Sequence, residues 1–416
     1  DQTGPTFSFR GFENRAYYIL GKNRSQYENF SGTGNTLNSN HAIVRRLILD
    51  SLRYWVQEMH VDGFRFDLAS ILSRDQKGVP LVNPPVIWDI ETDPVLAGTK
   101  LIAEAWDAGG LYQVGTFSGD RWKEWNGRFR DDVRSFVKSD QGMTSKLAAR
   151  LLASPDLYAH EEREPEQSIN FITCHDGFTL NDLVSYNHKH NWANKEGNRD
   201  GHNHNLSWNC GVEGPTDDPN IERLRKKQIK NFLVINLLAL GVPMLLMGDE
   251  VRRTQMGNNN AYCQDNEISW FDWSLLNKHA DIHRFVKELI RYRLSLGVYK
   301  DIRGISLTQL LQTAQLDWHG IKLHETDWGF DSHSLAFSVR GRRGLFHVIF
   351  NAYWGLLEFE LPPTDEQGLT PWRKIIDTSQ DSPEDFCEIE TAPLVSSNGL
   401  TVAARSVVVL VAHLTK

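Results

Sequence analysis

Three carboxylates, those of Asp67, Glu104 and Asp176, each lie at or near the end of an apolar run of the kind that forms β-strands. The runs cover residues 61–67, 101–106 and 171–176. An acidic side chain that follows a buried strand lies at the carboxyl edge of a parallel sheet, where barrel enzymes gather their catalytic groups. A retaining glycosidase needs a carboxylate nucleophile, a proton donor and stabilisation of an oxocarbenium-like transition state. The order and the neighbours of these acids fit that chemistry.

Arg65 precedes Asp67 by two residues, and the two-residue period of a strand places both side chains on one face. A cation beside a carboxylate lowers its pKa and keeps it ionised, as a nucleophile requires. The alternative is a buried Arg–Asp ion pair with a purely structural role.

Glu104 lies between Ala103 and Ala105, with Trp106 next to them. Apolar surroundings raise the pKa of a carboxyl group, and a raised pKa suits a general acid at neutral pH. The alternative is a surface glutamate at the end of a strand.

His175 and Asp176 form a polar pair at the end of the third run. Such a pair can bind sugar hydroxyls, while the carboxylate favours positive charge at the anomeric carbon. The alternative is a helix cap, because residues 177–179 could begin a helix directly after Asp176.

The elements that must position these residues alternate between strand-like and helix-like patterns. Strand candidates are residues 61–67, 100–106, 169–176 and 242–249, with a further short one at 120–126. Helical spacing is found over residues 41–60, 143–152, 221–240 and 280–296. Strands that alternate with helices predict a parallel sheet covered by helices. About five such units are present, whereas a closed barrel needs eight.

The pattern changes after residue 296. Short β-branched or aromatic runs, separated by turn residues, cover 333–340, 345–351, 356–361 and 400–413. Such runs without intervening helices predict an antiparallel β-sandwich appended to an α/β domain. We place the two domains at residues 1–310 and 311–416, with a boundary somewhere in 297–330.

One loop, residues 187–220, is long, polar and poor in regular structure. Loops of this length inside compact domains commonly serve as lids or binding walls. A disordered excursion is the alternative, but the aromatic residues Tyr186, Trp192 and Trp208 argue against it.

The composition is that of an ordinary globular protein and excludes several classes of partner. The net charge is −8, from 45 basic and 53 acidic residues, and no basic block suggests nucleic acid or an anionic membrane. The four cysteines are widely spaced without a CxxC pair, which predicts neither a disulfide framework nor a zinc site and fits a reducing compartment. The 13 tryptophans serve either core packing or stacking on sugar rings.

The three acid-bearing runs resemble three of the four short signature regions of the α-amylase superfamily of glycoside hydrolases. Within it, the sequence is similar to the isoamylase and bacterial glycogen-debranching branch. The strings that carry this resemblance are residues 4–11 (GPTFSFRG), 34–38 (GNTLN), 106–115 (WDAGGLYQVG), 199–201 (RDG) and 205–211 (NLSWNCG).

The resemblance implies a role for each matched residue. Asp67 would be the nucleophile, Glu104 the acid/base and Asp176 the transition-state stabiliser, while Arg65 and His175 would line the subsite of the reacting sugar. Further substrate contacts would come from Trp106, Asp107, Arg199 and Asp200. The loop 187–214 and residues 257–262 (GNNNAY) would flank the sugars at the branch point.

The resemblance also implies a (β/α)8 TIM barrel followed by an antiparallel β-sandwich domain. Members of this family carry an N-terminal carbohydrate-binding domain, the first three β/α units and a first signature region. Here the first matching string begins at residue 4 and corresponds to a position just after that region. Because five units would leave two sheet edges exposed, we expect another chain or a longer form of the protein to supply the rest.

The function that follows is hydrolysis of α-1,6 branch linkages in glycogen, amylopectin or malto-oligosaccharides with retention of configuration. We expect no cofactor, since no acidic cluster marks the structural calcium known in the superfamily, and a homo-oligomer is left open. We expect a cytoplasmic location, or the plastid stroma in a photosynthetic eukaryote. The alternatives are an α-1,4-acting amylase or transglycosylase, and a non-catalytic glucan-binding subunit.

Overall fold

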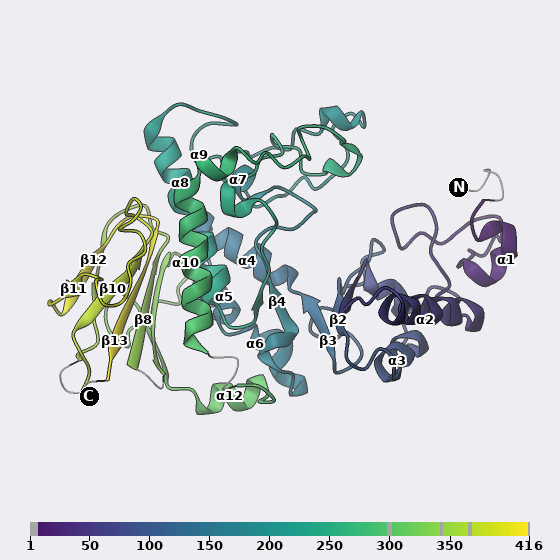
Figure 1. The fold of residues 1–416 in the computed structure, drawn as a ribbon, viewed down its shortest axis with the longest axis horizontal. Coiled ribbons are helices and arrows are strands. Elements are labelled where there is room, and N and C mark those ends of the chain that lie inside the picture. The colour runs from purple at the N-terminus through teal and green to yellow at the C-terminus, as the bar shows by residue number, and fades with distance from the viewer. Residues whose placement is uncertain (1–6, 298–301, 342–343, 365–367, 415–416) are drawn as a thin grey trace. The chain divides into compact units, whose positions relative to one another are not determined.

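A computed structural model describes residues 7–297, 302–341, 344–364 and 368–414 (Figure 1). The first residues of the 4–11 string, 4–6, lie outside the described residues. The chain forms two compact units, one of Asp1–Asn126 with Asp156–Ile169 and one of Gly127–Pro155 with Asn170–Lys416. The predicted boundary near residue 310 does not coincide with this division, and it stays a prediction.

Unit 1 is built on parallel strands that run in register. Its strands are β1 (Gly63–Phe66), β2 (Lys100–Ala103), β3 (Trp122–Trp125) and β4 (Ser168–Asn170), which continues one residue into unit 2. Phe66 pairs with Ala103, and Ala103 pairs with Glu124. A Cβ on Gly63 would lie 2.7 Å from the carbonyl oxygen of Lys100, so glycine lets β1 approach β2 closely.

The helices of unit 1 follow the predicted apolar spacing in part. They are α1 (Arg10–Tyr17), α2 (Ala42–Gln57), α3 (Pro85–Thr92) and α6 (Pro155–Tyr158). Helix α2 confirms the helix predicted over 41–60, and it begins where the His41 side chain accepts a hydrogen bond from the Ile43 N–H. Val44 and Leu52 are buried on one face of this helix.

Unit 2 joins a helical layer to antiparallel sheets. Its helices are α4 (Gly127–Lys138), α5 (Thr144–Leu151), α7 (Leu180–Leu183), α8 (Pro219–Leu238), α9 (Leu275–Lys278), α10 (Ala280–Leu296) and α12 (Leu307–Thr313). A six-stranded sheet has the order β11-β10-β13-β8-β7-β6, and β12 pairs with β9. These strands are β6 (Leu316–His319), β7 (Ser334–Gly341), β8 (Gly344–Asn351), β9 (Leu357–Glu360), β10 (Trp372–Asp377), β11 (Leu394–Val395), β12 (Gly399–Val402) and β13 (Ser406–His413). The predicted antiparallel β region is therefore confirmed.

Strand β13 shows why the sheet lies between two cores. Alternate residues of a strand point to opposite faces. Val407, Val409 and Val411 belong to the core shared with the helices, whereas Val408 and Leu410 belong to the core shared with β9 and β12. Figure 1 shows α8 and α10 running side by side next to this sheet. The unbroken apolar sequence of β13 follows from burial on both faces.

Several predicted elements differ from the structure. The strand expected at 169–176 ends at Asn170 in β4, and the strand expected at 242–249 ends at Pro243 in β5 (Val242–Pro243). After each of these strands the chain leaves the sheet as a loop. Helix α4 was not predicted, although its buried residues Phe129, Val133 and Phe136 have helical spacing. Within the described ranges, every helix is too short or too polar to span a lipid bilayer. The closed eight-stranded barrel stays a prediction.

Candidate active site

The register of β1 and β2 brings Asp67 and Glu104 together in unit 1. Asp67 follows the last residue of β1, Glu104 follows the last residue of β2, and the Glu104 N–H donates to the Phe66 carbonyl at 3.1 Å. Arg65 connects the two acids, because its Nη1 lies 3.0 Å from Asp67 Oδ1 and its Nη2 contacts Glu104 Oε1. One guanidinium therefore holds both carboxylates.

Arg65 is itself fixed by an aromatic ring. Its guanidinium carbon lies 4.5 Å from the centre of the Trp125 ring, which β3 contributes two strands away. Stacking on an indole face is favourable for a guanidinium and restricts its rotation. Trp125 thus orients the fork that Arg65 presents to Asp67 and Glu104.

The two carboxylates differ in their exposure to solvent. The Asp67 side chain is 77% exposed, whereas the Glu104 side chain is 5% exposed. Besides Arg65, Glu104 accepts a hydrogen bond from the Leu68 N–H to its Oε2 at 2.9 Å. The surroundings of Glu104 therefore include a cation, unlike the apolar setting expected from its neighbours, and the raised pKa expected of it stays a prediction.

The backbone turns sharply after Asp67. Leu68 has φ 41° and ψ 51°, in the left-handed region that a branched residue rarely adopts. In this conformation the Leu68 N–H reaches the side chain of Glu104, and the Ala69 N–H reaches its carbonyl at 2.8 Å. Backbone conformations of this kind cost on the order of 1–3 kcal/mol and cluster at functional sites.

Trp106 and Asp107 lie in the loop that follows Glu104. The Trp106 ring stacks on Tyr112, with centroids 6.2 Å apart and an interplanar angle of 10°. The Asp107 side chain is buried, pairs with Arg74 at 2.7 Å and accepts the N–H groups of Gly109 and Leu111. These contacts show how Asp107 shapes the loop, while its contact with substrate stays a prediction.

His175 and Asp176 lie in unit 2, in the loop after β4. His175 Nε2 is 3.6 Å from Asp176 Oδ2, and the two side chains are 54% and 61% exposed. The helix cap considered as an alternative is provided by Thr179, whose side chain accepts a hydrogen bond from the Asp182 N–H. Asp176 therefore does not serve as the N-cap of α7.

The 187–214 loop and residues 257–262 are joined in unit 2 by side-chain amides. Asn194 accepts hydrogen bonds from Asn258 and Gln264 at 2.9 and 2.7 Å. The Asn259 side chain accepts from Asn191 and donates to Asn205, at 2.9 and 2.8 Å. Although these segments lack long helices, their backbone is anchored at many points.

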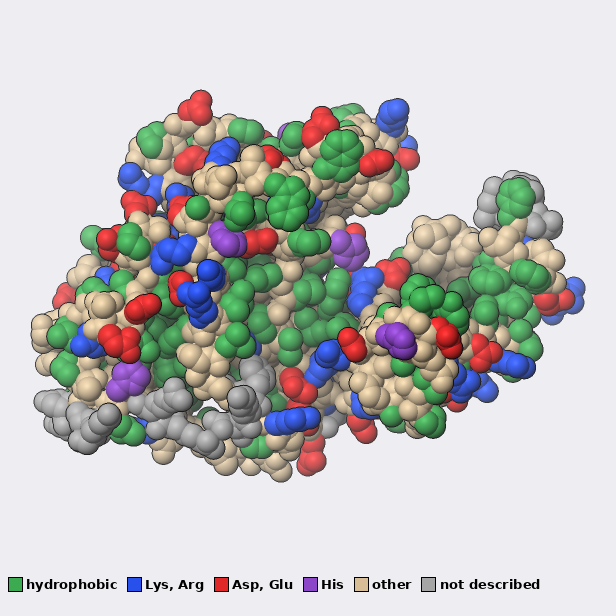
Figure 2. Space-filling view, viewed as in Figure 1, with side chains coloured by type: hydrophobic (Ala, Val, Ile, Leu, Met, Phe, Trp, Pro, Cys, Tyr) green, Lys and Arg blue, Asp and Glu red, His purple; other side chains and the backbone are tan. Residues whose placement is uncertain are grey.

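Asp200 is part of this network and Arg199 lies on its surface. Burial opposes ionisation of Asp200, but hydrogen bonds from Asn194 and Asn260 lower its pKa below the ordinary value. Arg199 is exposed, and its Nε donates to the Glu196 carbonyl at 3.1 Å. Figure 2 shows apolar side chains on the surface of this loop region, among whose exposed aromatic residues are Trp192 and Tyr262.

Three residues that the sequence did not indicate contact the predicted site residues and fix their positions. Trp125, Leu68 and Arg74 contact Arg65, Glu104 and Asp107, respectively. The presence of two tryptophans in the four residues of β3 is a weak signal for Trp125. The other two have none, since their partners lie more than 30 positions away.

The class that the fold and the site define is an α/β protein with paired carboxylates at the carboxyl ends of adjacent parallel strands. Its solved structural neighbours include pullulanase from Bacillus acidopullulyticus, with a TM-score of 0.68, 21% identity and 95% of this chain and 43% of that chain covered. A pullulanase from Paenibacillus barengoltzii, in complex with maltohexaose and α-cyclodextrin, has a TM-score of 0.67 at 22% identity, with 95% and 54% of the two chains covered. At this identity the likeness concerns the fold.

Sequence comparison places the chain among the homologues of isoamylases and bacterial glycogen-debranching proteins. It is 44% identical to isoamylase SU1 of Zea mays over 93% of this chain and 50% of the relative. It is 45% identical to the glycogen operon protein GlgX homolog of Mycobacterium tuberculosis, over 98% of this chain and 58% of the relative. Residues 317–409 match the family model of the C-terminal region of isoamylases 1–3. The chain thus spans about half the length of the curated relatives it matches.

Proposed function

We propose that the protein containing this chain is a retaining glycoside hydrolase that cleaves α-1,6 branch linkages of glycogen or amylopectin. The observation that carries the proposal is the fork of Arg65 between Asp67 and Glu104. Two carboxylates that share one guanidinium favour the closer spacing of retaining enzymes over the wider spacing of inverting ones. Homology to isoamylases and a glycogen debranching enzyme supports the choice of linkage.

The proposed reaction has two steps. In the first, Glu104 gives its proton to the glycosidic oxygen as the bond to the anomeric carbon breaks, and a carboxylate oxygen of Asp67 bonds to that carbon. In the second, Glu104 takes a proton from water, the water oxygen bonds to the anomeric carbon, and Asp67 leaves as a carboxylate. Asp176 would stabilise the positive charge in both transition states. No step needs a metal or an organic cofactor.

Other residues would bind the glucan. Sugar rings stack on aromatic faces, which suits the Trp106–Tyr112 pair, and Arg65 and His175 would line the reacting subsite. Arg199, Asp200 and residues 257–262 would contact sugars at the branch, with Asp107 as a further contact. In the whole protein these elements would belong to a (β/α)8 barrel. The isoamylases of Zea mays and Arabidopsis thaliana that this chain resembles are chloroplastic, which supports the plastid stroma for a protein from a photosynthetic eukaryote. For a bacterial protein we propose the cytoplasm.

The test is release of reducing ends by the full-length protein from glycogen, pullulan and amylose assayed side by side. Glycogen cleaved at branches, with amylose left intact, is the expected result. Replacement of the nucleophile in Asp67→Ala should lower the rate on glycogen by several orders of magnitude, about 10⁴-fold or more. Cleavage of amylose would instead indicate an α-1,4-acting amylase or transglycosylase. Glucan binding without hydrolysis would indicate a non-catalytic subunit.

A further inference from the structure

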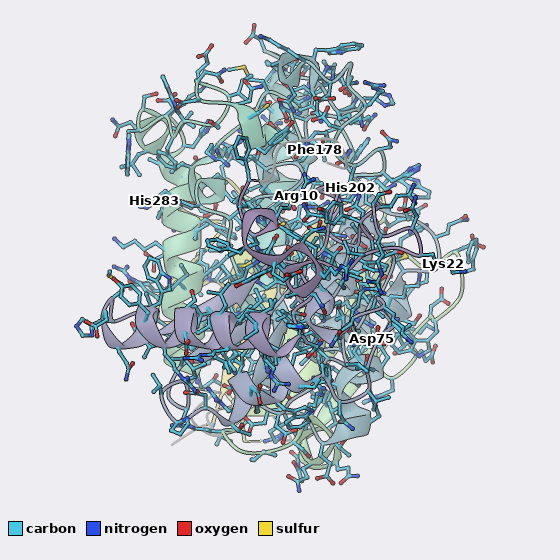
Figure 3. The ribbon with its side chains drawn as sticks, turned by 90° about the vertical axis from the view of Figure 1, so that its right-hand side faces the viewer. Arg10, Lys22, Asp75, Phe178, His202 and His283 are labelled. Atoms are coloured by element: carbon cyan, nitrogen blue, oxygen red, sulfur yellow. The ribbon has the colours of Figure 1, made fainter. Side chains whose placement is uncertain are left out.

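The segment that carries His175 and Asp176 is a short loop with buried ends. Phe171, Ile172 and Thr173 on one side are almost fully buried, as are Phe178, Thr179 and Leu180 on the other, and Phe178 is labelled in Figure 3. Between them, the side chains of His175 and Asp176 are more than half exposed. What fixes the two ends therefore fixes the direction in which the exposed acid projects.

A single buried carboxylate, that of Asp249, bonds to both ends of this loop. Its Oδ2 accepts the hydroxyl of Thr173, and its Oδ1 accepts the N–H of Leu180 at 2.9 Å. Asp249 is 1% exposed and begins the 3-10 turn η5 (Asp249–Val251), about 70 residues further along the chain. Asp249 therefore bridges the two ends of the loop from a distant part of the chain.

Two further contacts fix the same segment. Arg134, on α4, donates from Nε and Nη2 to the Ile172 carbonyl at 2.9 and 2.6 Å. The Gly177 N–H donates to the Asn259 carbonyl at 3.0 Å, and a left-handed φ of 96° suits the glycine at this position. With Asp249, these contacts leave the loop little freedom to turn.

We propose that Asp249 is a positioning residue for Asp176: by joining Thr173 to Leu180, its carboxylate sets the direction in which the Asp176 side chain points. The inference rests on the proposed function, because Asp176 has a direction to keep only if it acts on a bound sugar. Asp249 does not touch the substrate in this scheme. It acts through the backbone of residues 173–180.

The charge state of Asp249 gives the contact a pH dependence. Burial raises the pKa of Asp249 to about 7. The hydrogen bonds from Thr173 and Leu180 and the nearby Arg253 lower this pKa, whereas Glu250 raises it further. Arg134, from α4, also faces this carboxylate. The ionised form accepts both hydrogen bonds, whereas the protonated form has a hydrogen on one of the accepting oxygens. The protonated form keeps both bonds only if the Thr173 hydroxyl turns from donor to acceptor.

The experiment compares Asp249→Ala and Asp249→Asn in the full-length protein, with kcat and KM measured on a branched malto-oligosaccharide. Asp249→Ala loses both bonds, and we expect kcat to fall roughly 10- to 100-fold, as for other small displacements of catalytic groups, with KM within about threefold. An asparagine can accept from Leu180 and donate to Thr173, so Asp249→Asn should keep kcat within about threefold. Its kcat should also vary less than that of the wild type between pH 6 and 8.

Two further variants separate positioning from stability. Thr173→Val keeps the shape of the side chain and removes one bond, and its effect on kcat should be smaller than that of Asp249→Ala and not additive with it. Asp385→Ala is the matched control, because Asp385 is as buried as Asp249 but pairs with Lys230 and Arg284. We expect it to lower the melting temperature and leave kcat unchanged at a temperature where the variant is folded.

The possible results distinguish failure of this inference from failure of the proposed function. An active wild type whose kcat is unchanged in both Asp249→Ala and Thr173→Val overturns the inference alone. Asp249→Ala and Asp385→Ala losing activity equally, in proportion to their unfolded fractions, would also overturn it, since the role would then be structural. A wild type that is inert on every glucan overturns the proposed function and this inference with it. If Asp249→Ala does not fold, the kcat of Thr173→Val is the test: a lowered kcat supports the inference, and an unchanged kcat overturns it.

Discussion

The strand-end acids of unit 1 and the loop acid of unit 2 are held by different means. Asp67 and Glu104 occupy equivalent positions because β1 and β2 pair in register. Arg65, on β1, bonds to both acids. Asp176 lies in a loop beyond the end of β4, and side chains from α4 and η5 fix the ends of that loop. Strand pairing and the local Arg65 side chain position Asp67 and Glu104, whereas buried side chains from distant elements position Asp176.

This difference fits the separate roles proposed for the two regions. In the proposed mechanism Glu104 would transfer a proton and Asp67 would form a covalent bond, which requires a fixed separation between the two carboxyl groups. Asp176 would only project its charge toward the sugar, and its direction would depend on distant partners. Variants in the two regions should therefore respond differently to the leaving group of the substrate.

The largest expected effect is a difference between variants of Glu104 and Asp176 in how their rates depend on the leaving group of the substrate. Glu104→Gln removes the proton donor, so hydrolysis of glycogen should fall about 10²- to 10⁴-fold. With an activated aryl or fluoride leaving group, which departs without protonation, the first step should recover most of its rate. Asp176→Asn should lose activity on both kinds of substrate. Steady-state and burst kinetics on the two substrates give the comparison, and equal losses for Glu104→Gln on both would contradict the role of acid.

A smaller effect is expected from the residue that joins the strand-end pair. Lysine carries one ammonium group and cannot present the planar fork of arginine to two carboxylates. We expect Arg65→Lys to lower kcat/KM on glycogen roughly 10- to 100-fold through misplacement of Asp67 relative to Glu104.

Arg53→Lys is the matched control for Arg65→Lys. Arg53 pairs with the buried Asp93 elsewhere in unit 1 through both Nε and Nη2. The same chemical change at this ion pair should leave kcat/KM within about twofold of the wild type, as expected of a residue outside the site. Equal losses in the two variants would show that Arg65 acts through stability alone.

The same contrast explains how much of the site could be predicted from the sequence. The positions of Asp67 and Glu104 follow from local patterns, since an apolar run with an acid at its end is visible within seven residues. Strand β13 could be predicted for the same reason. The contacts of Arg134 with Ile172, and of Asp249 with Thr173, join residues 38 and 76 positions apart and leave no local pattern. Strand β6 was missed because it has four residues, of which only Leu316 and Trp318 are apolar, and β10 was missed because Arg373 and Lys374 interrupt its apolar alternation.

Each region also contains a buried carboxylate with a pKa raised to about 7, and the two differ in their partners. Burial is the main cause for both Glu124 and Asp249. Glu124, on β3, pairs with Arg163 at 2.7 Å and accepts hydrogen bonds from the Gly115 N–H and the Tyr158 hydroxyl. Gly115 ends the loop that begins at Trp106. Glu124 therefore holds the end of this loop through the Gly115 N–H and is itself paired with a cation, whereas the hydrogen bonds of Asp249 come from neutral groups.

The smallest expected effect is on the pH dependence of stability. Because the pKa of Glu124 is higher in the folded than in the unfolded protein, its contribution is fully present below the unfolded value near 4.5 and is lost as the pH rises through about 7. Glu124→Gln does not ionise, so urea unfolding at pH 5 and pH 8 should show a smaller decline than in the wild type, by on the order of 1–3 kcal/mol. The exposed Glu58→Gln should decline as the wild type does. An undiminished decline in Glu124→Gln would mean that Arg163 keeps Glu124 ionised throughout, and the two buried carboxylates would then differ in charge as well as in partners.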